Sequence, residues 1–108
     1  MSHKVFLTAD AVNDLEEIYE YIAYHDAPEK AEHVLGRIER TFKSLSESPE
    51  RGSFPKELLT LGVRDYRQIF FKPYRVIYQI ISDKVYVMLI TDGRRDMEDL
   101  LQRRLLLA

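Results

Sequence analysis

One segment, Lys84–Thr91, constrains the fold more than any other because it is apolar at almost every position. Side chains alternate between the two faces of a strand, so Val85, Val87 and Leu89 are expected on one face and the residues between them on the other. A strand that is apolar on both faces lies inside a sheet whose two faces are both covered. The rest of this 108-residue chain must therefore supply two covers for one central strand.

Two amphipathic helices precede that strand and are predicted to cover one of its faces. The run Lys4–Thr8 is typical of a short strand, and Thr8 is a suitable N-cap for the helix that follows. That helix is expected to end near His25. Its apolar positions recur at helical spacing and are Val12, Leu15, Ile18, Ile22 and Ala23.

The second helix is predicted to start at the run Asp26-Ala27-Pro28-Glu29. In a capping box the Asp26 carboxylate accepts from the Glu29 amide, and the Glu29 side chain reaches back to the Asp26 amide. Pro28 lies in the first turn, where its missing N–H loses no hydrogen bond. A tight connection makes the two helices an antiparallel pair. The apolar face of the second helix comprises Ala31, Val34, Leu35, Ile38, Phe42 and Leu45.

The remaining chain is predicted to form a loop and a three-strand meander. The loop is Ser48–Pro55, and three leucines after it are expected to plug the core, namely Leu58, Leu59 and Leu61. A final helix, Arg94–Leu106, is expected to cover part of the second face of the sheet. The strands are Tyr66–Phe71, Tyr74–Ile81 and Lys84–Thr91, joined by turns at Lys72-Pro73 and Ser82-Asp83.

This order predicts an α+β fold with an N-terminal strand, an antiparallel helical hairpin, a three-strand antiparallel meander and a C-terminal helix. The length predicts a single domain over residues 1–108. The chain has no cysteine, and its histidines (His3, His25 and His33) lack metal-ligand spacing, so no metal or cofactor is expected. The longest apolar run, Val85–Ile90, is far shorter than the roughly 20 residues that span a bilayer. We therefore expect a cytoplasmic protein that makes no membrane contact.

Charge is distributed unevenly along the chain. Residues 1–50 carry 5 basic and 11 acidic side chains, whereas residues 51–108 carry 11 basic and 7 acidic ones. This polarity indicates either an acidic solvated face with a basic working face, or simply acidic helical surfaces. The basic half interleaves Arg64, Arg67, Lys72 and Arg75 with aromatic residues, a pattern that suits phosphates and bases, an acidic protein, or ordinary solvation of a sheet edge.

The run Arg94-Arg95-Asp96 directly follows the central strand, at the end of the sheet where side chains from several strands converge. Arg95 and Asp96 are able to pair with each other or to cap the last helix, where Asp96 is favourable near the N-terminus. The run therefore has a structural and a functional interpretation, and the sequence leaves both open.

Several stretches in this order resemble the ParE/RelE superfamily of bacterial toxins, and the resemblance covers nearly the whole chain. The resemblance implies the toxin of a type II toxin–antitoxin module, in which a cognate antitoxin wraps the toxin with a segment that folds on binding. The matching stretches are Ala11–Ile22, Leu45–Gly52, Val63-Arg64, Tyr74–Tyr78 and Thr91–Asp96.

The superfamily divides by function. RelE-like members cut mRNA in the ribosomal A site, whereas ParE-like members poison DNA gyrase. RelE-like nucleases commonly have a His or Tyr near the chain end and a very basic sheet. Here no His or Tyr follows Tyr86, and the isoelectric point is about 5.9. The Leu-Glu-Glu-Ile helix and the Gly-Arg-Arg-Asp ending resemble the ParE branch.

The leading hypothesis is therefore a gyrase-binding toxin without enzymatic activity, forming a hetero-oligomer with its antitoxin. Its target-binding residues are expected to be Arg67, Arg75, Arg94 and Arg95. Antitoxin contacts are expected at Leu15, Tyr19, Ile22, Leu105 and Leu106. One alternative is a ribosome-dependent mRNA endonuclease using Arg64, Arg67 and Arg75 with Tyr74 or Tyr78 as base. The other is a non-toxic homologue that only binds the antitoxin.

Overall fold

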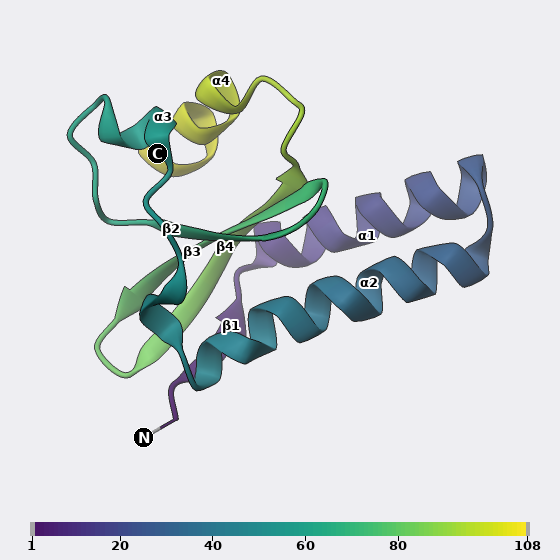
Figure 1. Ribbon diagram of the computed structural model, residues 1–108. Helices are drawn as coiled ribbons and strands as arrows, with labels where there is room; N and C mark the ends of the chain where they lie inside the picture. Colours follow the sequence, from purple (N-terminus) through teal and green to yellow (C-terminus); the bar gives the residue numbers. More distant parts are fainter. Residues whose placement is uncertain (1, 108) are drawn as a thin grey trace.

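The structure is a computed structural model that describes residues 2–107. A four-stranded sheet has the strand order β1-β4-β3-β2, in which β1 is parallel to β4 and the other pairs are antiparallel. The long helices α1 and α2 form the predicted hairpin beside the sheet, while the short helices α3 and α4 gather at the other side (Figure 1). The strands are β1 (Lys4–Leu7), β2 (Arg67–Phe71), β3 (Tyr74–Ile81) and β4 (Lys84–Asp92). The helices are α1 (Ala9–His25), α2 (Pro28–Lys43), α3 (Lys56–Leu59) and α4 (Met97–Leu101).

The predicted α+β fold and its element order are confirmed, including Thr8 as the cap of α1, whose Oγ1 accepts from the Ala11 amide at 3.1 Å. The prediction of a capping box at the start of α2 is wrong. The N-cap residue is Ala27, whose side chain makes no capping hydrogen bond. Asp26 instead closes α1, its amide donating to the Ile22 carbonyl at 2.8 Å, and its carboxylate pairs with Lys30 at 2.9 Å. The α1–α2 connection is so tight that Asp26 belongs to the end of the first helix.

The predicted alternation of side chains along β4 fails at one residue. The pairing with β3 shifts between Ile77 and Tyr78, so that Met88 is an extra, bulged residue of β4. The shift places Ile90 on the helical-hairpin face with Val85 and Val87, and turns Leu89 to the opposite face. A bulge adds a residue to one strand only, and hydrophobicity alone does not reveal it because every residue involved is apolar.

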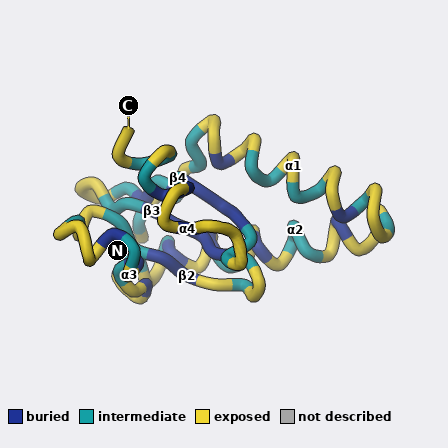
Figure 2. Tube along the Cα trace, turned by 90° about the horizontal axis from the view of Figure 1, so that it is seen from above, coloured by how far each residue is buried: buried dark blue, intermediate teal, exposed yellow. Residues whose placement is uncertain are grey.

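Each face of the sheet has its own core. On the hairpin face, residues from α1 and α2 such as Ala11, Ile38 and Phe42 pack against β3 and β4. On the other face, Met97, Leu100 and Leu101 of α4 and Leu58 of α3 pack against Ile77 and Leu89. Figure 2 shows the buried stretches following the strands, with the outer sides of the helices exposed. The final segment therefore covers the second face, as predicted.

Three local expectations need correction. Val12, Leu59 and Leu61 are exposed rather than packed, so Leu58 alone forms the plug. Helix α2 ends at Lys43, and Leu45 is buried from a following single turn of 3-10 helix, Ser44–Ser46. The last helix begins at Met97, because the Asp96 side chain caps it by accepting from the Asp99 amide at 3.2 Å, and it widens into a π-helical turn at Gln102–Leu106. Arg94 and Arg95 therefore precede the helix.

Candidate target-binding surface

Residues 93–96, here called the arginine loop, connect β4 to α4 and present two arginines to solvent. The Arg94 guanidinium donates to the Asp92 carboxylate from Nε at 2.9 Å and from Nη2 at 2.6 Å, yet the Arg94 side chain is 78% exposed. This guanidinium lowers the pKa of Asp92, and the carboxylate raises the pKa of Arg94 in return. The Arg95 guanidinium donates one hydrogen bond within residues 2–107, from Nη1 to the Thr91 hydroxyl at 3.4 Å, and no ion pair in that range involves it.

The arginine loop, α1 and the last residues of β4 line a groove of about 460 Å³. The lining thus combines two arginines with acidic and aromatic side chains, which suits a polar protein surface more than an apolar ligand. The lining residues are Asp14, Glu17, Ile18, Tyr21, Tyr74, Ile90, Thr91, Asp92, Arg94 and Arg95.

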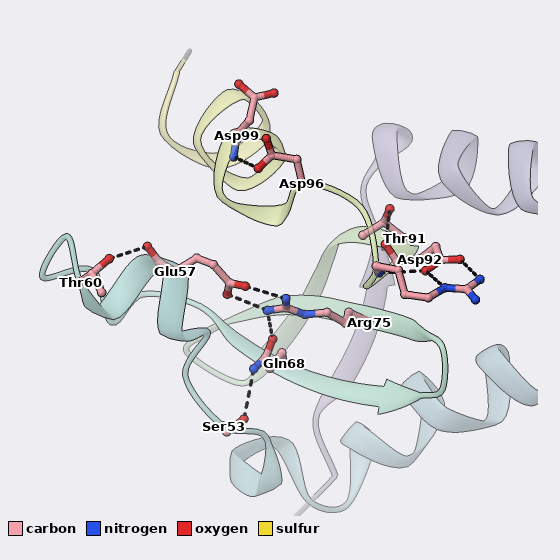
Figure 3. Close-up of polar contacts among 10 residues, drawn as sticks. Ser53, Glu57, Thr60, Gln68, Arg75, Thr91, Asp92, Asp96 and Asp99 are labelled. Carbon is pink, nitrogen blue, oxygen red and sulfur yellow. Dashed lines mark hydrogen bonds and ion pairs between the residues drawn. The ribbon is translucent and has the colours of Figure 1, made fainter.

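Arg75, a predicted target-binding residue, is buried and already paired. Its guanidinium donates to the Glu57 carboxylate at 2.9 and 3.0 Å and to the side-chain oxygen of Gln68 (Figure 3). The hydrogen bond from Arg75 lowers the pKa of Glu57, and Gln68 in turn donates to Ser53. Only 8% of Arg75 is exposed, so its charge is matched inside the protein.

Gly93 explains how Arg75 fits beneath the arginine loop. A Cβ atom at this position would lie 2.7 Å from Cδ of Arg75 and 3.2 Å from the Pro73 carbonyl oxygen. Only glycine permits that approach without a shift of the neighbours. Arg75 therefore supports the loop from below, whereas Arg94 and Arg95 face outward.

The other predicted arginines do not join Arg75. Arg67 lies on the hairpin face of the sheet, and its Nη1 donates to the carbonyls of Glu50 and Gly52 at 3.2 and 2.9 Å while its guanidinium sits 4.5 Å from the Phe54 ring. Arg64 is exposed in the connection between α3 and β2. Arg67 of β2 pairs with Tyr78 of β3, which lies three positions from Arg75. Because successive side chains of a strand alternate between its two faces, Arg75 points to the face opposite Arg67.

The two candidate base residues are largely built into the structure. Tyr78 is fully buried, donates to the Pro49 carbonyl at 2.6 Å and accepts from the Gly52 amide at 3.0 Å. Burial raises its pKa. Burial, and then the Asp92 carboxylate, raise the pKa of Tyr74, which is half-buried in the groove. A raised pKa leaves less of either side chain as phenolate at neutral pH, and the phenolate is the form that accepts a proton.

A second hollow, of about 590 Å³, lies on the side of the sheet that carries Arg75. It brings Lys56 and Lys72 together with the aromatic rings of Phe54 and Phe70, next to Arg94. Sequence reasoning missed Lys56, Glu57 and Gln68 because α3 brings the first two to the sheet from a separate segment. Glu57 is 18 residues from Arg75 in sequence, so no helix or strand periodicity links them.

The predicted antitoxin residues fall into two groups. Leu15 and Tyr19 line a hollow of about 360 Å³ between the two long helices, together with Val12 and Leu35. Ile22 is buried in the hairpin, Leu105 packs on the second core, and Leu106 is 38% exposed. Within the described residues no group of three His, Asp or Glu side chains has the spacing of a metal site. No helix in that range is long and apolar enough to cross a membrane.

Residues 5–97 match the family model described as ParE toxin of type II toxin-antitoxin system, parDE. The chain is 28% identical to Toxin ParE3 of Caulobacter vibrioides over 94 residues, which cover 87% of this chain and 90% of that protein.

Solved structures share the fold at lower identity. The chromosomal ParDE system of P. aeruginosa gives a TM-score of 0.71 at 19% identity, covering 84% of this chain and 96% of that one. A free mutant of E. coli toxin RelE gives 0.63 at 16% identity and covers 97% and 100%. The RelBE2 toxin–antitoxin complex of Mycobacterium tuberculosis gives 0.56 at 20% identity and covers 85% and 92%. Because the family match spans residues 5–97, the chain belongs to the ParE toxins of type II toxin–antitoxin systems.

Proposed function

We propose that this toxin inhibits DNA gyrase by binding it through the arginine loop, and that a cognate antitoxin neutralises it. The observation that carries the proposal is the position of Arg94 and Arg95, which project from the end of the sheet while Arg75 and Gly93 support the loop beneath them. Two exposed guanidinium groups next to a groove are suited to carboxylates or phosphates on a partner. Of the four arginines predicted to bind the target, the proposal therefore keeps Arg94 and Arg95.

The contacts inside the sheet favour binding over catalysis. Strand cleavage by the 2′-hydroxyl needs a proton acceptor and free cations around the reacting phosphate. Arg75 already pairs with Glu57, Arg67 holds backbone carbonyls, and Tyr74 and Tyr78 have raised pKa values. These residues therefore stabilise the structure. By contrast, Arg94 stays largely exposed although it pairs with Asp92, and Arg95 has no ion pair within the described residues.

The first test compares the wild-type protein with the double variant Arg94→Ala/Arg95→Ala in a gyrase supercoiling and DNA-cleavage assay. Each arginine–carboxylate contact at an interface contributes about 1.5–3 kcal/mol, so inhibition should weaken at least about tenfold. Arg103→Ala is the matched control, because Arg103 is an exposed arginine whose one ion pair within the described residues is with Asp99. Circular dichroism should show all three proteins equally folded.

A pulse-label after brief induction in bacteria tests the target in cells. Thymidine incorporation should fall before methionine incorporation, and the double variant should delay that fall. A folded double variant with undiminished inhibition would remove the arginine loop from the proposal. Normal growth despite soluble wild-type protein would instead support a non-toxic homologue that only binds the antitoxin.

The hollow on the second sheet face supports one further candidate, a ribosome-dependent mRNA endonuclease. Its lysines and aromatic rings are suited to phosphates and stacked bases. This candidate predicts cleaved mRNA in arrested ribosomes and a loss of cleavage in Lys72→Ala. An early fall in methionine incorporation would favour it over gyrase inhibition.

The antitoxin is proposed to bind the hollow between α1 and α2 through apolar anchors of a segment that folds on binding. Leu15 and Tyr19 line that hollow. The similar solved structure from Mycobacterium tuberculosis is a complex of a toxin with an antitoxin. Tyr19→Ala should weaken antitoxin binding measured by calorimetry, whereas the exposed Tyr24→Ala at the end of α1 should leave it unchanged.

A further inference from the structure

A single carboxylate, that of Asp14 on α1, contacts the chain on both sides of the arginine loop. Its Oδ2 accepts from the backbone amide of Ile90, just before the loop, at 3.0 Å. Its two oxygens also accept from Nη1 and Nη2 of Arg104, beyond the loop, at 2.9 and 3.0 Å. The stretch that carries Arg94 and Arg95 is therefore tied at both ends to one side chain.

These side chains form hydrogen bonds with backbone groups along an edge of β4 that is not paired with another described strand. β1 ends at Leu7, opposite Val87, so among residues 2–107 the second half of β4 has no neighbouring strand on that side. The bulge at Met88 lies where that edge opens. The Met88 carbonyl accepts from Nη2 of Arg104 at 3.1 Å, and the Ile90 amide is satisfied by Asp14. A donor and an acceptor of the open edge are thus both paired, as buried backbone groups require.

The pair, here called the Asp14–Arg104 clasp, is well shielded and lies outside both hydrophobic cores. The Asp14 side chain is 12% exposed and that of Arg104 is 21% exposed. Two parallel hydrogen bonds between a guanidinium and a carboxylate fix direction as well as distance. Neither residue is a member of the two core clusters.

The geometry points to Asp14 and Arg104 as positioning residues that set where Arg94 and Arg95 stand relative to α1. Asp14 lines the same groove as both arginines, and Thr91 next to Ile90 receives the hydrogen bond from Arg95. The link to activity rests on the proposed function, in which those arginines contact gyrase. The link to loop conformation does not depend on it.

Hydrogen–deuterium exchange tests the conformational part in the isolated protein. Asp14→Ala and Arg104→Ala should each raise amide exchange over residues 90–96 by about tenfold or more, and the double variant should add little to the larger single effect. Asp14→Asn keeps the volume and one acceptor, and serves if the alanine variants unfold. Asp26→Ala is the control, because it removes only the exposed Asp26–Lys30 pair. Unchanged exchange over residues 90–96 in a folded clasp variant would overturn the inference.

Gyrase inhibition at matched concentrations of folded protein tests the functional part. Asp14→Asn should weaken inhibition to a similar degree as Arg95→Ala. The double variant should inhibit gyrase only slightly less than either single variant. Full inhibition by Asp14→Asn beside a weakened Arg95→Ala would overturn the positioning role. If the wild-type protein does not inhibit gyrase, the proposed function fails, and the exchange data alone decide whether the clasp sets the loop.

Discussion

Arg75 and Glu57 illustrate at the scale of single residues how this protein handles a buried charge. Their side chains are 10% and 15% exposed and are joined by two hydrogen bonds. Replacing Glu57 by Gln leaves the Arg75 charge buried without its partner, which should lower the free energy of unfolding by about 3 kcal/mol. Urea unfolding measures the change. Glu39→Gln, which removes the exposed Glu39–Lys43 pair, should change it by less than about 0.5 kcal/mol. Equal effects of the two substitutions would contradict this role.

The same pair predicts a pH dependence of stability. The hydrogen bond from Arg75 holds the pKa of Glu57 below its ordinary value of 4.5. A carboxyl group with a lowered pKa in the folded state stabilises the fold fully above its unfolded pKa, and this is lost as pH falls through the folded pKa. The free energy of unfolding should therefore decline as pH falls below about 4.5, and decline less in Glu57→Gln. Parallel declines in the two proteins would exclude Glu57 as a contributor.

Gly36 provides a prediction at the scale of one element. It lies within α2, and a Cβ atom added there would have no atom within 4 Å from outside the helix. Alanine has the higher helix propensity, so Gly36→Ala should stabilise the protein by about 0.5–1 kcal/mol. Thermal unfolding followed by circular dichroism measures this gain. Gly93→Ala should instead destabilise, because its Cβ would meet Arg75. A loss of stability in Gly36→Ala would contradict the prediction, because it would mean that the added Cβ meets a neighbouring group.

The elements were largely predictable because their signals are local. Helical spacing and the Thr8 cap place α1, and a β-rich run places β3 at its observed bounds. The bulge at Met88 was not predictable, since it depends on which β3 residue faces each β4 residue. The sequence offered Asp96 as a cap of the last helix, and Asp96 is the observed N-cap, but the predicted start at Arg94 was wrong because the two arginines precede that cap.

At the scale of the whole molecule, the candidate site was only partly predictable for a related reason. The arginine loop follows from its place after the central strand. The Glu57–Arg75 pair and the Asp14–Arg104 clasp do not, because they join segments far apart in sequence. Charge patterns mark the residues that carry function or pairing, but only the packed structure separates the two. It places Arg75 with the paired residues and Arg95 with the exposed ones.

The two cores share one sheet, and this predicts how the whole molecule unfolds. Ile38 of the hairpin-face core and Leu101 of the other are both fully buried. Each alanine substitution should lower the free energy of unfolding by about 2–5 kcal/mol. Both should shift the same cooperative unfolding transition to lower urea concentration, because β3 and β4 belong to both cores. Leu107→Ala, at a residue that is 67% exposed, should stay within about 0.5 kcal/mol of wild type. The chain has seven Tyr and no Trp, so urea unfolding is followed by tyrosine fluorescence and circular dichroism together. Transitions that separate between the two probes in Leu101→Ala would mean that α4 and its core unfold independently of the helical hairpin.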